Sequence, residues 1–287
     1  MAAAGDSASL LTTAARSGVG AVLLYATVAR RFFALRDPEL QQSCFRLYND
    51  WMIDYCQSAR ERLFGIAMLA TYDIEAAVDE IKRCHQAGLK GAEIWEIPDP
   101  AIPFSSNHYE PLWEAACALK LPISIHATQP ARFTKGGADG TRVDAVGKEL
   151  GAISNAVYDL IFYGVMERFP DLNIVLVGQE IGWIPFFFQQ LDYYYRRFSK
   201  QLTLPLKQAP SEYLRRQIHA TLCEDAVGIR QLVGRDAANF MWSSELFEPA
   251  YERALVDRLA PLTSEQRAQL TYANAMRLYQ IENLNQG

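Results

Sequence analysis

Short apolar runs recur along the chain, and polar, glycine or proline residues separate them. The runs are rich in β-branched and aromatic side chains, which is typical of strands buried in a sheet. The seven runs are GAVLLYAT (20–27), RLFGIAMLAT (62–71), KGAEIWEI (90–97), PISIHAT (122–128), NIVLVGQE (173–180), IHATLCE (218–224) and ANFMWSSE (238–245). The pattern therefore predicts seven strands.

Helical patterns fill the intervals between these runs. Segment 73–88 opens with Asp73 as an N-cap, places Ile81 and Cys84 on one face and ends at Gly88. Further helices are predicted over 109–120, 152–170, 186–197 and 263–281, the last opening with a capping box, and a first helix over 6–18 precedes the first strand.

The alternation of strand and helix predicts the fold. A chain that repeats this unit seven times is expected to form a parallel α/β structure. So many units in 287 residues favour a TIM-type (β/α)₈ barrel over a doubly wound sheet. The G-x-G-x-x-G fingerprint of dinucleotide folds follows none of the strands. Because the first element is a helix, we expect a single barrel domain over 1–287 that lacks its first strand.

Composition excludes several classes of protein. The formal net charge of −5 argues against nucleic-acid binding, which usually needs a basic surface. The five cysteines are odd in number and form no C-x-x-C pair, so neither a disulfide framework nor a cysteine-based zinc site is indicated. We therefore expect a cytoplasmic protein. No run is long enough to span a membrane, and the apolar segment 20–29 is interpreted as a strand rather than a signal peptide.

Polar residues at the predicted strand ends are the candidates for chemistry, because reacting groups of such barrels sit at the carboxyl ends of the strands. His126 shares a face of its strand with Ser124, and Glu180 shares a face with Leu176. If these faces point inward, His126, Glu180 and Glu245 converge at the barrel mouth, where they would suit a divalent metal or an acid–base pair. The alternatives are a hydrogen-bonded core histidine and water-facing loop residues.

Four residues at or just beyond neighbouring strand ends are predicted to contact a small-molecule substrate. They are Glu96, Gln179, Trp183 and Glu224. The histidines elsewhere are given no such role. His219 begins its strand and should lie at the opposite end of the barrel, while His85 and His108 should be solvated. The aromatic helix 186–197 is expected to be a core or subunit-interface helix, and a homodimer is predicted.

Four segments resemble one known family. They are YEPLWEAACALKLPISIHA, FPDLNIVLVGQEIGWIPFFFQQLD, RRQIHATLCEDAVGIRQLVGRDAANFMWSSELFEP and NAMRLY. Together they are similar to the amidohydrolase-related barrels that include aminocarboxymuconate-semialdehyde decarboxylase. The resemblance implies a metal-dependent hydrolase or non-oxidative decarboxylase of the amidohydrolase superfamily. It places His126 at the position of a metal histidine and Glu245 at that of the proton-handling aspartate of the family.

The chain departs from the family pattern at several positions. The family's first strand carries an H-x-H metal pair, and the sequence contains no H-x-H. Gly178 occupies the place of a sixth-strand histidine, and Phe247 and Glu248 replace the Pro-His that follows the eighth strand. A catalytic zinc usually has three protein ligands, and here His126, Glu245 and Glu180 would have to serve. Binding of zinc or manganese is expected to be weak or lost.

Three hypotheses about function follow. The first is a metal-dependent hydrolase or carboxy-lyase acting on a small carboxylic or aromatic substrate, with His126 and Glu245 as catalytic residues. The second is a catalytically impaired barrel that serves as an oligomerisation or binding partner. The third is a metal-free acid–base enzyme that uses His126 with Glu180 or Glu245.

Overall fold

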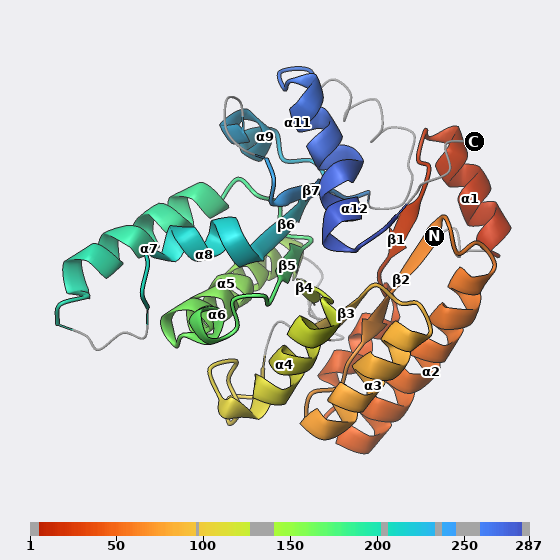
Figure 1. The fold of residues 1–287 in the computed structure, drawn as a ribbon, viewed down its shortest axis with the longest axis horizontal. Helices are drawn as coiled ribbons and strands as arrows, with labels where there is room; N and C mark the ends of the chain where they lie inside the picture. Colours follow the sequence, from red (N-terminus) through yellow and green to blue (C-terminus); the bar gives the residue numbers. More distant parts are fainter. Residues whose placement is uncertain are drawn as a thin grey trace.

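Seven parallel strands form one sheet in the order in which they occur along the chain (Figure 1). In the computed structural model they are β1 (Val22–Leu24), β2 (Leu63–Met68), β3 (Gly91–Trp95), β4 (Ile123–His126), β5 (Ile174–Val177), β6 (Ile218–Leu222) and β7 (Phe240–Trp242). Each strand lies inside one of the seven predicted runs, so these predictions are confirmed.

The structure describes residues 6–95, 98–126, 141–201, 206–232, 237–244 and 259–282. For residues 141–149 it describes the backbone only. Within these ranges every neighbouring pair of strands is parallel. No pairing there joins β7 back to β1. The fold is therefore a TIM-type barrel that lacks one strand, as predicted.

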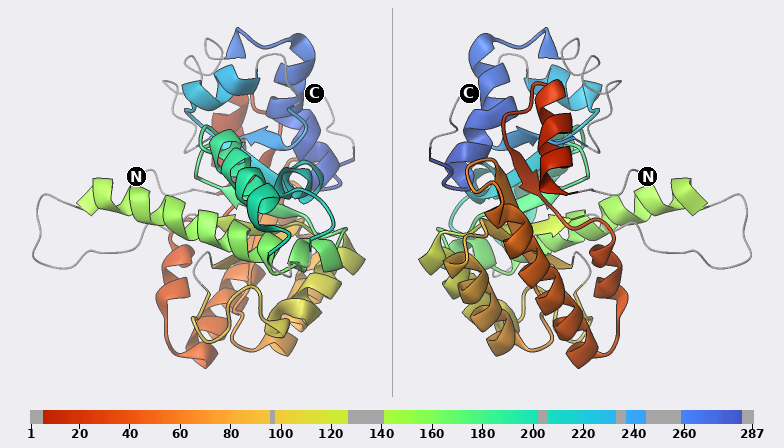
Figure 2. Two further views of the ribbon diagram at one scale, coloured as in Figure 1. Left: turned by 90° about the vertical axis from the view of Figure 1, so that its left-hand side faces the viewer. Right: turned by 90° about the vertical axis from the view of Figure 1, so that its right-hand side faces the viewer.

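Helices connect the strands and cover the outside of the sheet (Figures 1 and 2). They are α1 (Ser7–Arg16), η1 (Ala29–Ala34), α2 (Pro38–Gln57), α3 (Ile74–Gln86), η2 (Asn107–Tyr109), α4 (Glu110–Leu119), α5 (Thr141–Phe162), α6 (Val165–Arg168), α7 (Ile184–Phe198), α8 (Pro210–Gln217), α9 (Ala226–Leu232), α11 (Ser264–Ala268), η3 (Gln269–Ala273) and α12 (Asn274–Leu278). The first turns of α5 project away from the rest of the molecule (Figure 2).

One helical prediction needs correction, and helices α2, α8 and α9 were not among the predicted elements. The single helix predicted over 152–170 is divided, because Gly164 adopts a left-handed φ of 78° between α5 and α6. Helix α2 was not predicted, because its buried face is interrupted by the polar residues Gln41 and Asn49. Asn49 binds both the N–H and the carbonyl of Met68 and thereby attaches α2 to the end of β2.

The core has an outer and an inner layer. The outer layer fills the space between the sheet and its helices and includes Ile174 and Leu176 of β5. The inner layer lies on the opposite face of the strands and is built from Ile66, Val175, Val177, Met241 and Tyr279. Tyr279 follows α12, so the C-terminal helix closes part of the barrel interior.

The prediction that segment 186–197 forms a core helix is confirmed by α7. Ile184, Phe188 and Leu191 are buried in the outer layer, while Phe186 and Tyr194 remain exposed. A subunit interface on the exposed side stays a prediction.

None of the helices described by the structure is both long and apolar enough to cross a membrane.

Candidate active site

His126 is the last residue of β4 and lies at the carboxyl end of the sheet, as predicted. It is in register with Trp95 of β3 and Val177 of β5, which places its side chain on the inner face of the strands. Burial is the main cause that lowers the pKa of His126 well below its usual value, and the positive charge of Arg30 adds to this effect. The imidazole is therefore neutral at neutral pH.

Glu93 of β3 faces the same ring. Its Oε1 atom lies 3.6 Å from Nδ1 of His126, and the Glu93 side chain is only 1% exposed. The sequence prediction missed this residue because Glu93 lies in the middle of an apolar strand rather than at its end. The sequence did contain a signal for Glu93, namely a charged residue inside an apolar run. Glutamate is almost never fully buried without a partner, so such a position indicates a specific contact.

Tyr25 packs against His126 from the end of β1. The two rings meet edge to face, with 5.4 Å between their centroids. The Tyr25 hydroxyl lies 2.8 Å from the Ser124 hydroxyl and 2.8 Å from the Tyr279 hydroxyl. This chain of three hydroxyl groups supports the ring that contacts His126.

Arg30 of η1 brings positive charge to the same region. Burial raises the pKa of Tyr48 well above its usual value, the Glu93 carboxylate adds to the increase, and Arg30 opposes it. Arg30 also acts on the pKa of His126, and Glu93 acts on that of Tyr25. Arg30 and Glu93 therefore lie close enough to exert their charges on the same group of side chains.

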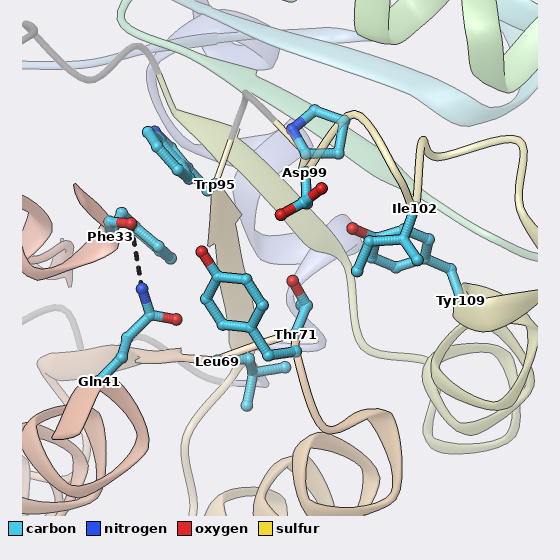
Figure 3. A pocket seen from close by; sticks show the side chains of 10 residues that line it. Phe33, Gln41, Leu69, Thr71, Trp95, Asp99, Ile102 and Tyr109 are labelled. Carbon is cyan, nitrogen blue, oxygen red and sulfur yellow. Dashed lines mark hydrogen bonds between the residues drawn. The ribbon is translucent and has the colours of Figure 1, made fainter. Parts of the chain in front are cut away.

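A small hollow adjoins the site at the carboxyl ends of β2 and β3 (Figure 3). Trp95 forms one wall, and its ring is stacked with that of Phe33 at a centroid distance of 6.4 Å. Asp99 and Thr71 point toward each other across the hollow (Figure 3). About 20 Å³ is open to the centre of a water molecule, which is room for roughly one water. The hollow suits a small polar group rather than a ring.

The predicted residue Glu180 lies in the loop after β5 and binds the backbone of the neighbouring loop. Its two carboxylate oxygens accept hydrogen bonds from the N–H groups of Cys223 and Glu224 at 2.9 and 3.0 Å. The predicted face of β5 was wrong, because Leu176 packs outward, whereas Val177 shares the inner face with His126. The strand parity does not extend to Glu180, because Gly178 and Glu180 have positive φ values of 78° and 55°.

Three of the predicted substrate-contact residues lie in the two neighbouring loops that follow β5 and β6. Gln179 and Trp183 belong to the β5–α7 loop, and the Trp183 indole donates hydrogen bonds to the carbonyls of Gln179 and Glu180. Glu224 follows β6 and is exposed. Glu96 and the predicted catalytic residue Glu245 lie outside the described residues. The roles of all five stay predictions.

The other three histidines differ in their exposure and in their hydrogen-bond partners. His219 lies near the start of β6, as predicted, and its Nε2 donates to Oδ1 of Asn173 at 3.1 Å. His85 is exposed on α3. His108 was predicted to be solvated, but its Nε2 donates a 2.6 Å hydrogen bond to the carbonyl of Thr71, because a carbonyl oxygen can only accept.

The number of donor groups at the mouth decides whether a metal ion fits this site. Among the residues that the structure describes, no three His, Cys, Asp or Glu side chains gather as a metal site. His126 and Glu93 supply two donors at the mouth, whereas a catalytic zinc usually has three protein ligands. The described residues therefore do not by themselves fit a catalytic metal.

Comparisons with known proteins identify related sequences. Decarboxylase orsB of Emericella nidulans is 30% identical over 139 residues, which are 45% of this chain and 41% of that protein. Gamma-resorcylate decarboxylase of Polaromonas is 24% identical over 201 residues, which are 66% of this chain and 60% of the relative. The matched part of the chain thus spans less than two thirds of these relatives.

Solved structures extend the likeness to nearly the whole chain. The 5-carboxyvanillate decarboxylase LigW of Sphingomonas paucimobilis is 26% identical, with a TM-score of 0.74 over 95% of this chain and 82% of that one. A dihydroxybenzoic acid decarboxylase of Polaromonas, solved with manganese and 2-nitroresorcinol, is 20% identical, with a TM-score of 0.79 over 96% and 86%. The family model described as Amidohydrolase matches residues 20–281. The chain therefore belongs to the amidohydrolase family.

Proposed function

We propose that this chain is a non-oxidative decarboxylase of a small aromatic carboxylate. The observation that carries the proposal is the neutral, buried imidazole of His126 beside Glu93 at the barrel mouth, within reach of the Arg30 charge and against the Tyr25 ring. Three of the similar proteins, orsB, gamma-resorcylate decarboxylase and LigW, are named as decarboxylases, and this supports the choice over the hydrolase that the sequence also allowed. None of these relatives supports the alternative of an impaired barrel.

The proposed reaction breaks the bond between the aromatic ring and its carboxylate. Carbon dioxide leaves, the bonding electron pair stays on the ring carbon, and a proton takes the place of the carboxyl group. The reaction consumes no oxidant or reductant. The site must therefore hold an anion, hold a flat ring and manage one proton.

Residues at the mouth match these three tasks. The Arg30 guanidinium attracts the substrate carboxylate, and the rings of Tyr25 and Trp95 offer aromatic surface. Neutral His126 accepts a hydrogen bond from a ring hydroxyl group, which increases the electron density on the ring carbon that receives the proton. Glu245, predicted from the family resemblance, would deliver that proton.

A divalent metal remains a separate question. The solved relative that contains manganese motivates a test of zinc and manganese on this chain. Of the three predicted ligands, Glu180 already binds two backbone N–H groups and Glu245 lies outside the described residues. The proposed roles of Arg30, His126 and Glu245 do not require a metal.

The test is a decarboxylation assay on hydroxybenzoates with one or two ring hydroxyl groups. The purified chain is assayed without oxygen, as isolated, after chelation and with added manganese or zinc. Equal amounts of carbon dioxide and of the matching phenol are expected, and His126→Asn should lower the rate at least 100-fold. If no hydroxybenzoate is converted under any metal condition, the proposal is wrong. Turnover of an aryl ester instead would restore the hydrolase hypothesis.

A further inference from the structure

We infer that Glu93 is the positioning residue for His126: its carboxylate accepts the Nδ1–H of the ring, so that the lone pair of the neutral ring is on Nε2. The inference rests on the proposed function only for what the oriented ring then does. The tautomer itself is a property of the protein without substrate and can be measured on its own.

The sheet fixes the relative positions of the two side chains. Glu93 is in register with Ser124, two residues before His126 on the adjacent strand, so both side chains point to the inner face. Nδ1 and Oε1 are 3.6 Å apart, and a shift of a few tenths of an ångström brings them within hydrogen-bond range. Such contacts are often long in free enzymes and shorten when a ligand binds.

Electrostatics selects one of the two neutral tautomers. A neutral imidazole carries its proton on either Nδ1 or Nε2. If Nδ1 had no proton, its lone pair would face the buried Glu93 oxygen, and two acceptors would oppose each other where solvent cannot screen them. With the proton on Nδ1 the same contact is attractive. The side chains are 12% and 1% exposed, so water offers little compensation for the wrong tautomer.

The orientation of the ring decides which nitrogen can accept a proton. With the proton on Nδ1, the lone pair of the neutral ring is on Nε2, the nitrogen that a substrate hydroxyl group would have to reach. Carboxylates that hold the far nitrogen of a metal-ligating histidine raise its basicity, and their loss typically costs 10- to 100-fold in activity or metal affinity. We expect an effect of similar size for Glu93 on His126. Tyr25 restricts the same ring from its edge.

The chain contains its own reference signals for the measurement. It has four histidines in total. Nε2 of His108 and Nε2 of His219 each face an oxygen that accepts, so both rings carry their proton on Nε2. His85 is exposed on α3 and free to exchange with water. His126 is expected to show the opposite tautomer from two other buried or half-buried histidines of the same molecule.

The experiment is long-range ¹H–¹⁵N NMR on the full chain labelled at histidine, with each signal assigned by single substitution. In the wild-type protein at neutral pH, His126 should show the Nδ1–H pattern and His108 and His219 the Nε2–H pattern. An Nε2–H pattern for His126 would overturn the inference. This outcome requires no substrate and no Glu93 variant.

Substitutions then test whether Glu93 is the cause. Glu93→Leu removes the acceptor and should abolish the preference for Nδ1–H, while Glu93→Gln, whose amide oxygen can still accept, should keep more of it. Tyr25→Phe perturbs the same surroundings without touching Nδ1 and should leave the tautomer as in the wild type. A folded Glu93→Leu variant with an unchanged tautomer would contradict the inference.

Activity separates this inference from the proposed function. If the wild type decarboxylates a hydroxybenzoate, Glu93→Leu should lower kcat about 10- to 100-fold and change KM less. If the wild type is inactive but His126 is Nδ1–H, the proposed function fails and the positioning role stands. If the wild type is active and His126 is Nε2–H, the positioning role fails and the proposed function stands.

Discussion

Glu180 and Asp225 each accept hydrogen bonds from backbone N–H groups of the loop that contains the other residue. Glu180, after β5, accepts hydrogen bonds from two backbone N–H groups of the loop after β6. Asp225, in that second loop, accepts the N–H groups of Ile181 and Gly182 in the first, and also that of Gly228 at the start of α9. The two carboxylates therefore fasten two neighbouring loops at the mouth of the barrel.

Asp225→Asn should destabilise the protein. The amide group has one accepting oxygen, so at least one of three backbone donors would face an NH₂ group. Hydrogen bonds to a charged group contribute roughly 1.5–3 kcal/mol each, and we expect the free energy of unfolding to fall by about 3 kcal/mol. Urea denaturation followed by circular dichroism measures this change.

The matched substitution Glu180→Gln distinguishes a loop contact from a metal ligand. As a loop contact, it should lower the free energy of unfolding by roughly 1–2 kcal/mol and leave the metal content unchanged. A loss of bound zinc or manganese without a change in stability would instead support the ligand role that the sequence predicted for Glu180.

Gly228→Ala should also be destabilising, because this glycine packs against the same carboxylate. A Cβ atom at position 228 would lie 2.4 Å from Oδ2 of Asp225 and 2.4 Å from Cγ1 of Ile181. Overpacking of this kind costs about 1–3 kcal/mol. Gly151→Ala in α5 is the control, since nothing lies within 4 Å of its Cβ, and it should raise stability by up to about 1 kcal/mol. Thermal unfolding of both variants compares them.

Strand positions could be predicted from the sequence, whereas the site could be predicted only in part. Buried parallel strands are continuous apolar runs, and all seven were found for that reason. His126 was found because it ends such a run. Glu93 was missed because only the strand ends were searched, and its partner becomes visible only when β3 and β4 are placed in register.

The predicted role of Glu180 shows a second limit. Alternation of side chains assigns a face only while the backbone stays extended. Here the left-handed φ of Gly178 ends the alternation before Glu180. Helix α2 escaped prediction for a related reason, since the residues Gln41 and Asn49 are buried through specific hydrogen bonds that no apolar pattern reveals.

Acid should weaken the protein through His219. Burial, with a smaller contribution from Arg277, lowers the pKa of His219 to about 4, whereas the unfolded chain has a value near 6.5. Between pH 6.5 and about pH 4, His219 is therefore protonated in the unfolded chain and neutral in the folded protein. The contribution of His219 to the free energy of unfolding is fully present above pH 6.5. It falls by roughly 3 kcal/mol as the pH approaches 4.

His219→Gln removes this contribution. The free energy of unfolding of the variant should fall less steeply with acid than that of the wild type between pH 6.5 and 4. His126 contributes in the same direction in both proteins and cancels in the comparison. Parallel curves for the two proteins across this range would contradict the assignment to His219.

Tyr25→Phe should destabilise the barrel interior. The substitution keeps the ring against His126 but removes the hydroxyl that lies between Ser124 and Tyr279. Two buried hydroxyl groups then each lose a partner, and we expect a loss of roughly 1–3 kcal/mol. Tyr279→Phe removes a hydroxyl of the same network but keeps the 2.8 Å contact between Tyr25 and Ser124, and it should cost less. In a double-mutant cycle the two substitutions should be coupled by about 1 kcal/mol; strict additivity would contradict the network.

The proposed attraction of Arg30 for the substrate carboxylate predicts that the site prefers an anion and that Arg30→Gln removes this preference. The ligand pair is 2,6-dihydroxybenzoate and resorcinol, which differ only in the carboxylate, and calorimetry compares their dissociation constants. A charged hydrogen bond of roughly 1.5–3 kcal/mol predicts that the wild type binds the carboxylate about 10- to 100-fold more tightly. The variant should bind both ligands alike. Arg31→Gln, at the adjacent and exposed position of η1, is the control. It removes the same amount of positive charge as Arg30→Gln but leaves Arg30 in place, so this variant should keep the preference. If both variants lose it equally, the attraction comes from the overall charge of η1 rather than from Arg30.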